Sequence, residues 1–124
     1  MSRKSARRTL VTTAALLIIA TLTSCKSGNV FFTVENASGE TLHNVKVTYP
    51  GDDFTIATLT NSTTYGTHRR FDGPGDLAVS YSTDDGRTHS SSGPRVTGNE
   101  KGEVNISIAG SSANFETKFE ESQQ

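Results

Sequence analysis

The chain has 124 residues and a single cysteine, Cys25, so it can form neither an intramolecular disulfide nor a thiolate metal cluster. All 13 acidic residues follow Cys25 with 8 of the 12 basic residues, which gives this part a net charge of about −5 (8 − 13) with neutral histidines. Because nucleic acids attract basic surfaces, this balance argues against a nucleic-acid partner.

The first 24 residues have the pattern of a secretory signal peptide. Met1–Arg8 contains four basic residues and no acid, and Leu10–Leu22 contains only Leu, Val, Ala, Ile and Thr. A basic region followed by about 7–15 apolar residues is typical of a cleaved signal. The apolar stretch is shorter than the roughly 20 residues that span a bilayer. We therefore expect residues 1–24 to be removed.

Leu22-Thr23-Ser24-Cys25 resembles the lipobox of bacterial lipoproteins, with an aliphatic residue, two small residues and a cysteine. The resemblance implies cleavage between Ser24 and Cys25, a diacylglycerol on the Cys25 thiol, and a fatty acyl group such as palmitate on the new amine. Two acyl chains hold a protein stably at a bilayer. The resemblance therefore implies the lipid bilayer as a partner and a location on the exported side of the cell membrane or outer membrane, with no other cofactor.

Alternatives remain at this end of the chain. An ordinary secretory signal with an incidental cysteine, or an uncleaved N-terminal helix, also fits part of the pattern. Arg7-Arg8 matches a twin-arginine signal only in the paired arginines, so the export route stays open. In Gram-negative lipoproteins an aspartate after the cysteine commonly retains the protein at the inner membrane. Lys26 stands there in this chain, which favours the outer membrane in a host that has one.

After a short tether, residues 25–28, the chain alternates apolar and polar residues. Val30, Phe32 and Val34 are one such series, and three more follow it. This period of two puts one face of a strand on a core and the other in water. Turn-forming stretches at intervals near 8–12 residues separate the series. We predict an all-β domain over 29–109, a single antiparallel β-sandwich, immunoglobulin-like or similar, of about seven strands: 29–36, 42–49, 54–59, 63–71, 76–83, 87–97 and 103–109.

Three details of this prediction are less regular. Asp85-Gly86 is the best hairpin candidate, because glycine tolerates the positive φ of a primed turn. Phe54, Ile56 and Leu59 slip out of phase, which indicates a bulge or an edge strand. Residues 110–124 are interpreted as a polar acidic tail, and a short helix, an eighth strand and a frayed end all fit Phe115 and Phe119.

The remaining motifs carry no expected chemistry. The histidines (His43, His68, His89) lack local metal-ligand spacing, so we expect no metal site, and His43 shares phase with Val45. No nucleophile motif appears, and the acid pairs (Asp52-Asp53, Asp84-Asp85) lie in glycine-containing turns. His68-Arg69-Arg70 is interpreted as a solvated basic face, with an anionic partner as the alternative. Three glycosylation-type sequons (Asn36, Asn61, Asn105) are expected to be incidental.

These observations predict a non-enzymatic, membrane-anchored envelope lipoprotein that acts by binding or structural contact, with an envelope protein of unknown identity as partner. In pattern the mature part loosely resembles small β-sandwich lipoproteins of bacterial envelopes. The alternative is a small-ligand or carbohydrate-binding module that uses aromatic residues such as Tyr65, Phe71 or Tyr81. A hydrolase is a third hypothesis, and it requires a cleft that joins histidine with Asp or Ser.

Overall fold

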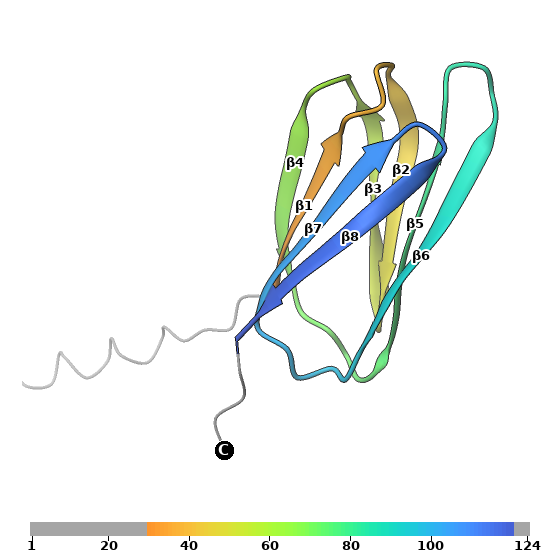
Figure 1. Ribbon diagram of the computed structural model, residues 1–124. Helices are drawn as coiled ribbons and strands as arrows, with labels where there is room; N and C mark the ends of the chain where they lie inside the picture. Colours follow the sequence, from red (N-terminus) through yellow and green to blue (C-terminus); the bar gives the residue numbers. More distant parts are fainter. Residues whose placement is uncertain (1–29, 121–124) are drawn as a thin grey trace, which may run out of the picture.

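The computed structural model describes residues 30–120, and these form eight strands in two sheets of four strands each (Figure 1). The predicted signal peptide (1–24), Cys25, Lys26 and the predicted tether lie outside the described residues. Among the described residues there is no helix with the length and apolarity to cross a membrane. The strands are β1 (Val30–Asn36), β2 (Leu42–Tyr49), β3 (Asp52–Leu59), β4 (Thr64–Arg69), β5 (Gly75–Ser82), β6 (Thr88–Val96), β7 (Gly102–Ala109) and β8 (Ser112–Phe119).

One sheet has the order β4-β1-β7-β8 and the other has the order β3-β2-β5-β6. Three hairpins, β2–β3, β5–β6 and β7–β8, pair neighbours in sequence. The β1–β7 pair is parallel, whereas all the other pairs are antiparallel. The prediction of an all-β sandwich is therefore confirmed, and the expected strand ends differ from the observed ones by no more than two residues among the described residues.

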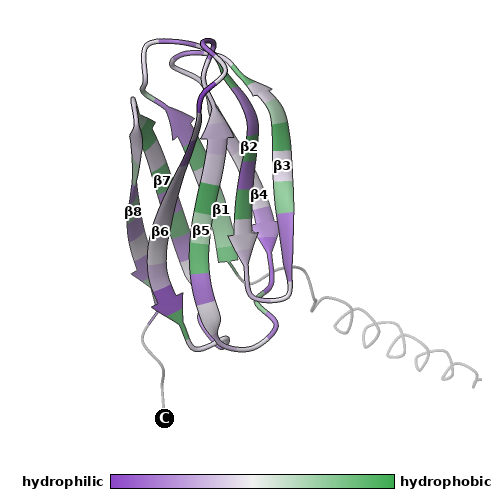
Figure 2. Ribbon diagram, turned by 90° about the vertical axis from the view of Figure 1, so that its right-hand side faces the viewer, coloured by the Kyte–Doolittle hydropathy of each residue, from purple (hydrophilic) through white to green (hydrophobic). Residues whose placement is uncertain are grey.

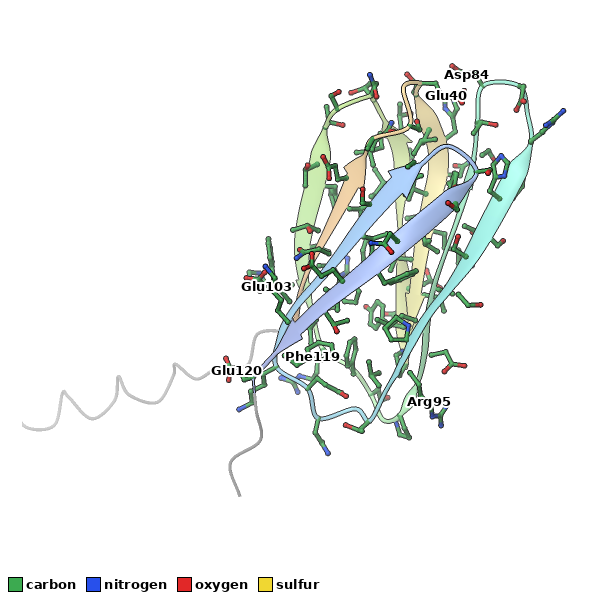
Figure 3. The ribbon with its side chains drawn as sticks, viewed as in Figure 1. Glu40, Asp84, Arg95, Glu103, Phe119 and Glu120 are labelled. Atoms are coloured by element: carbon green, nitrogen blue, oxygen red, sulfur yellow. The ribbon has the colours of Figure 1, made fainter. Side chains whose placement is uncertain are left out.

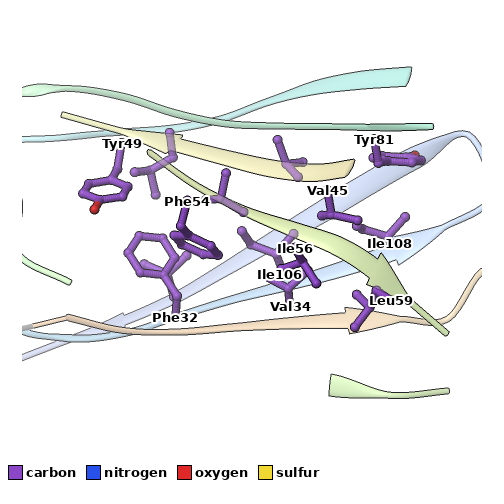
Figure 4. Close-up of a cluster of buried hydrophobic side chains, with 14 of the residues drawn as sticks. Phe32, Val34, Val45, Tyr49, Phe54, Ile56, Leu59, Tyr81, Ile106 and Ile108 are labelled. Carbon is purple, nitrogen blue, oxygen red and sulfur yellow. The ribbon is translucent and has the colours of Figure 1, made fainter. Parts of the chain in front are cut away.

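The core lies between the two sheets and is built by the alternation seen in the sequence. Side chains at alternate positions of β1 are buried, and those of β5 and β7 follow the same rule. Figure 4 shows apolar side chains from both sheets meeting in this layer. In Figure 2 green segments concentrate on central strands such as β1 and β5, whereas the edge strands β4 and β6 are mostly white and purple. Hydrophobic burial is thus the main force that holds the sheets together.

A kink in β2 moves His43 off the inner face. Asn44 has a positive φ of 51°, and the pairing of β2 with β5 shifts register between His43 and Lys46. As a result Leu42 and Val45, three residues apart, both point into the core. The expectation that His43 follows the phase of Val45 is therefore wrong. The paired strand β3 changes phase at the same place, and β3 is an edge strand, as the slip in its pattern indicated.

The interpretation of residues 110–124 as a tail is wrong for 112–119, which form β8. The spacing of four residues between Phe115 and Phe119 fits one face of a helix and equally one face of a strand. In the structure both residues lie in the strand. Phe115 and Phe119 turn toward the core with Ala113, and β8 pairs along the whole length of β7. This pairing covers an edge of β7 that would otherwise carry unsatisfied backbone groups. Residues 121–124 lie outside the described residues.

The predicted β5–β6 hairpin is confirmed, although its turn is longer than a two-residue primed turn. The Gly86 N–H donates to the Thr83 carbonyl at 2.9 Å, and the Thr83 N–H donates to the Arg87 carbonyl at 2.9 Å. Gly86 has φ of 86°, whereas Asp84 and Asp85 are not among the residues with positive φ. A turn followed by a glycine in this conformation is a common three-residue hairpin loop.

Candidate functional site

The sandwich has two ends, which we name after the first and last residues of β1. At the Val30 end lie the connections β2–β3, β4–β5 and β6–β7; at the Asn36 end lie β1–β2, β3–β4, β5–β6 and β7–β8 (Figure 1). In Figure 3 Glu40 and Asp84 mark the Asn36 end, whereas Phe119, Glu120 and Arg95 lie toward the Val30 end.

The Asn36 end is held together by one buried amide. Asn36 is fully buried, and its Nδ2 donates to the carbonyls of Glu40 at 2.7 Å and Leu59 at 2.8 Å. Its Oδ1 accepts hydrogen bonds from the Ser38 N–H at 2.9 Å and the Ser38 hydroxyl at 2.7 Å. All hydrogen-bonding positions of this side chain are thereby used, so Asn36 has a structural role: it links the β1–β2 connection to the end of β3. Its burial also makes the Asn36 sequon inaccessible.

The acid pair Asp84-Asp85 serves the β5–β6 turn. The Asp85 carboxylate accepts hydrogen bonds from the Thr83 hydroxyl and from the Arg87 N–H at 3.0 Å, and these bonds lower the pKa of Asp85. Asp84 Oδ1 lies 2.9 Å from His43 Nε2, and the Asp84 N–H donates to Glu40 Oε1 at 3.2 Å. The two carboxylates thus hold separate partners, as expected of turn residues.

The structure does not bring the three histidines together. His43 meets Asp84 at the Asn36 end. His68 lies against Phe31 with ring centres 4.6 Å apart, and His89 lies against Tyr81 at 5.4 Å. Residues 30–120 contain no group of three or more His, Cys, Asp or Glu side chains placed to hold a metal ion.

Of the three aromatic residues expected to contact a ligand, two belong to the core. Phe71 is 5% exposed and Tyr81 is 1% exposed. The Tyr81 hydroxyl donates to the Gly110 carbonyl at 3.0 Å, and burial raises the pKa of this phenol. Tyr65 is different: at 37% it is the one large hydrophobic residue of the described chain that is exposed. Of the three residues, Tyr65 is therefore the one that a ligand could contact.

Tyr65 lies where edge strand β4 of one sheet faces edge strand β3 of the other, a line that we call the β3–β4 seam. In β4, Tyr65 and Arg69 stand opposite the inward residues Val34 and Val30 of β1, so both point toward the seam. From the other sheet, Phe54 reaches the same place. Its ring centre lies 5.9 Å from that of Tyr65 and 5.0 Å from the Arg69 guanidinium carbon. At this seam the Arg69 guanidinium lies over the Phe54 ring, and the exposed Tyr65 ring lies beside Phe54.

The Arg69 guanidinium is poorly satisfied within the described chain. Its Nη1 donates to the Tyr49 hydroxyl at 3.4 Å, which is longer than a good N–H···O bond. Its Nε is buried and meets no acceptor among residues 30–120. The prediction of one solvated basic face at His68-Arg69-Arg70 is wrong for Arg69, because alternation along β4 places Arg69 on the seam and His68 on the outer face. The sequence contained the signal for this: positions 65, 67, 69 and 71 share one phase, and Phe71 is buried.

Comparisons with known proteins support the fold and leave the activity open. No known protein-family model matches the chain, and no curated protein matches it. A solved structure described as the NMR structure of the protein from Eubacterium rectale is similar, with a TM-score of 0.57 and 18% sequence identity. The match covers 74% of this chain and 90% of that chain. At this identity the likeness shows a shared fold alone.

Proposed function

We propose that the chain is a lipid-anchored protein of a bacterial cell envelope, and that its β-sandwich acts by binding rather than by catalysis. The observation that carries this proposal is the place of Cys25, in a lipobox-like sequence five residues before the first residue of β1. Five residues span at most about 18 Å. Lipid on Cys25 would therefore hold the Val30 end close to the bilayer and leave the Asn36 end facing away from it.

The charge of the body supports a role for the anchor. Residues 30–120 contain 12 acidic and 7 basic residues, a net charge of about −5 (7 − 12) with neutral histidines. Anionic headgroups repel such a body, and only clusters of basic residues near the surface add appreciable attraction. Two acyl chains would have to hold the protein at the membrane without help from the sandwich.

The positions of the histidines and of the Asp84-Asp85 pair support a non-enzymatic role. His43 and His89 lie near the β5–β6 turn, whereas His68 lies on the outer face of β4, and the Asp84 carboxylate pairs with His43 while that of Asp85 bonds within its own turn. General acid–base catalysis needs such groups within hydrogen-bond reach of one substrate. Binding through a surface fits these arrangements better.

The test of the anchor is a Cys25→Ala variant expressed in bacteria grown with labelled palmitate. Wild type is expected to take up label and to sediment with membranes, whereas the variant is expected to be unlabelled and released from the membrane fraction. A Ser27→Ala variant, changed two residues away, is the matched control and should behave as wild type. Label on the Cys25→Ala protein, or its undiminished sedimentation with membranes, would overturn the proposal.

The orientation has its own test. Exposed Lys101 lies in the β6–β7 connection at the Val30 end, and exposed Ser111 lies in the β7–β8 turn at the Asn36 end. A fluorophore on K101C is expected to be quenched by headgroup-labelled lipid in vesicles, and one on S111C to be quenched less. The label reacts only with the new cysteine, because the Cys25 sulfur is a thioether of diacylglycerol. Equal quenching at both positions would contradict a domain that stands on its Val30 end.

The second candidate function, a carbohydrate- or small-ligand-binding module, is favoured by one observation, the exposure of Tyr65. Sugar-binding surfaces commonly use an exposed aromatic ring with polar groups beside it. Burial of Phe71 and Tyr81 confines this function to the β3–β4 seam. It is compatible with the anchor, because a tethered module brings its ligand to the membrane surface.

A further inference from the structure

Arg69 differs from Arg87 and Arg95 in its contacts and its burial. Arg87 lies 3.5 Å from an Asp85 oxygen, and Arg95 lies 3.5 Å from an Asp76 oxygen, and both side chains are mostly exposed. Arg69 is half-buried and forms no ion pair within residues 30–120. A cation that is withdrawn from water is costly unless an anion or several hydrogen bonds compensate it. The seam therefore presents a positive charge that favours an anionic ligand.

The geometry of the guanidinium selects the kind of anion. The fork of an arginine matches a carboxylate through two parallel N–H···O bonds, and its face stacks on an aromatic ring. The face of the Arg69 guanidinium lies over the Phe54 ring, and its hydrogen bond to the Tyr49 hydroxyl uses Nη1 alone. The Nε side of the fork has no acceptor in the described chain. Because Nε is also shielded from water, a ligand carboxylate reaches this side of the fork only when the Arg69 side chain turns outward from the seam.

The charges on strands β3 and β4 favour a ligand with a single negative charge. Strands β3 and β4 contain no lysine and no arginine besides Arg69, and Asp52 and Asp53 begin β3. A doubly charged phosphate would meet one cation and nearby acids. Exposed hydroxyl side chains are frequent on the outer faces of both strands (Thr55, Thr58 and Thr64), and the turn between the strands adds Thr60, Ser62 and Thr63 at the Asn36 end, away from Arg69. Such groups donate to and accept from sugar hydroxyls.

We propose that the β3–β4 seam binds a carboxylated saccharide, in which Arg69 pairs with the carboxylate and the exposed ring of Tyr65 packs against a neighbouring sugar ring. Because Tyr65 and Arg69 flank the same Phe54 ring, an oligosaccharide of a few units reaches both. The carbon-bound hydrogens of a sugar face pack on an aromatic ring, whereas the hydroxyls of the sugar stay in contact with water. This inference names the ligand of the proposed binding role and does not depend on the lipid.

The test uses the full-length protein in detergent micelles and calorimetric titration with trigalacturonate. Uncharged galactotriose, inorganic phosphate and a short polyglutamate peptide are the comparison ligands. Saturable binding of trigalacturonate is expected, at least about 10-fold tighter than binding of any of the three others, because hydrogen bonds to a charged group carry that much discrimination. Equal binding of phosphate or of polyglutamate would overturn the assignment to a saccharide.

Variants locate the binding. Arg69→Gln is expected to weaken trigalacturonate binding by at least about 10-fold, and Arg69→Lys is expected to recover only part of it, since an ammonium lacks the fork. Tyr65→Ala should weaken binding by about 5-fold or more without changing the preference for a charged sugar. Arg95→Gln, an exposed arginine on the other sheet, is the matched control and should stay within about 2-fold of wild type. Circular dichroism confirms that each variant is folded.

No saturable binding of trigalacturonate up to about 10 mM, or unchanged binding by Arg69→Gln, would sink the inference. These results are distinguishable from failure of the anchor. If the ligand is wrong, wild type still takes up palmitate; if the anchor is wrong, the Cys25→Ala protein and wild type bind the sugar equally well and neither is labelled.

Discussion

The two sides of the sandwich are closed by different means. Edge strands β6 and β8, which belong to different sheets, contact each other along what we call the β6–β8 seam. There the Ala113 N–H donates to the Ser91 hydroxyl at 3.1 Å, and the Phe115 ring packs on the backbone of Gly93. At the β3–β4 seam, long side chains span the opening: Phe54 contacts Tyr65 and lies under Arg69. Close contact at one side contrasts with aromatic and cationic cover at the other.

This contrast between the two seams indicates where a ligand could bind. At the β6–β8 seam, Ser91 and Gly93 of one sheet closely contact Ala113 and Phe115 of the other. A seam covered by a half-exposed tyrosine and an arginine presents groups that can be used without moving the backbone. Both arrangements protect edge strands, which otherwise invite pairing with other chains.

The largest effect is expected from removing the ring that both sheets share at the β3–β4 seam. Phe54 is 5% exposed and also contacts Phe32 and Tyr49. Phe54→Ala should lower the free energy of unfolding by about 3–5 kcal/mol, because it removes a buried ring and leaves a cavity. Chemical denaturation measures this loss. Phe115→Ala, at a partly buried ring of the other seam, should cost less; an equal or larger loss there would reverse the ranking.

The next effect compares two glycines that each lie under a phenylalanine. A Cβ at Gly93 would stand 2.7, 2.8 and 2.9 Å from three atoms of the Phe115 ring. A Cβ at Gly66 would stand 2.7 Å from the tip of Phe31, on the outer face of the sheet. Gly93→Ala is expected to cost about 1–3 kcal/mol, since Phe115 packs on the core, and Gly66→Ala less than about 1 kcal/mol, because Phe31 can swing toward solvent. Thermal unfolding of the pair checks the order.

A smaller effect, of the opposite sign, is expected at Arg69. Arg69→Met keeps most of the apolar stem over Phe54 and removes a half-buried charge without a counter-ion. Stability should stay the same or rise by up to about 1 kcal/mol, while binding of trigalacturonate is lost. Arg95→Met is the control, with no change in binding. Destabilisation of Arg69→Met by more than about 2 kcal/mol would mean that the guanidinium serves the fold instead of a ligand.

An effect of similar size to that at Arg69 is expected in the connection from β6 to β7. The carboxylate of Glu100 accepts hydrogen bonds from the N–H groups of Thr97 at 2.8 Å and Gly98 at 2.9 Å. Burial opposes ionisation of Glu100, and these hydrogen bonds outweigh it, so its pKa is lowered from 4.5. A pKa that is lower in the folded state adds stability above the unfolded value, and this stability is lost as the pH falls below about 4.5 through the folded value.

Glu100→Gln should therefore reduce stability at pH 7 by about 1 kcal/mol and flatten its decline in acid, as followed by urea unfolding at several pH values. The connection from β3 to β4 offers the control. There the Asn61 side chain accepts from the Gly39 N–H at 2.9 Å, and no carboxylate takes part in that bond. Asn61→Ala should leave the acid slope of wild type intact; a flattened slope in this variant would contradict the role of Glu100.

Much of the fold was predictable because alternation is a local property. Val30, Phe32 and Val34 are each buried, and so are Val104, Ile106 and Ile108, as period two requires. The candidate site was predictable only in part. Tyr65 was among the aromatic residues considered, but its exposure and the burial of Phe71 and Tyr81 depend on which strands lie at an edge. The alternation of apolar and polar residues within one strand does not determine which strands lie beside it in the sheet.

Local sequence accounts for most strand segments and their core faces, for the acidic charge of the body and for the lipobox-like pattern at Cys25, because each depends on neighbours along the chain. Contacts between distant segments place β1 parallel to β7, turn His43 outward at Asn44 and add residues 112–119 to a sheet. They also place Arg69 beside Phe54 without a counter-ion in the described chain. These outcomes depend on packing between residues distant in sequence, where the burial of one strand sets the environment of another.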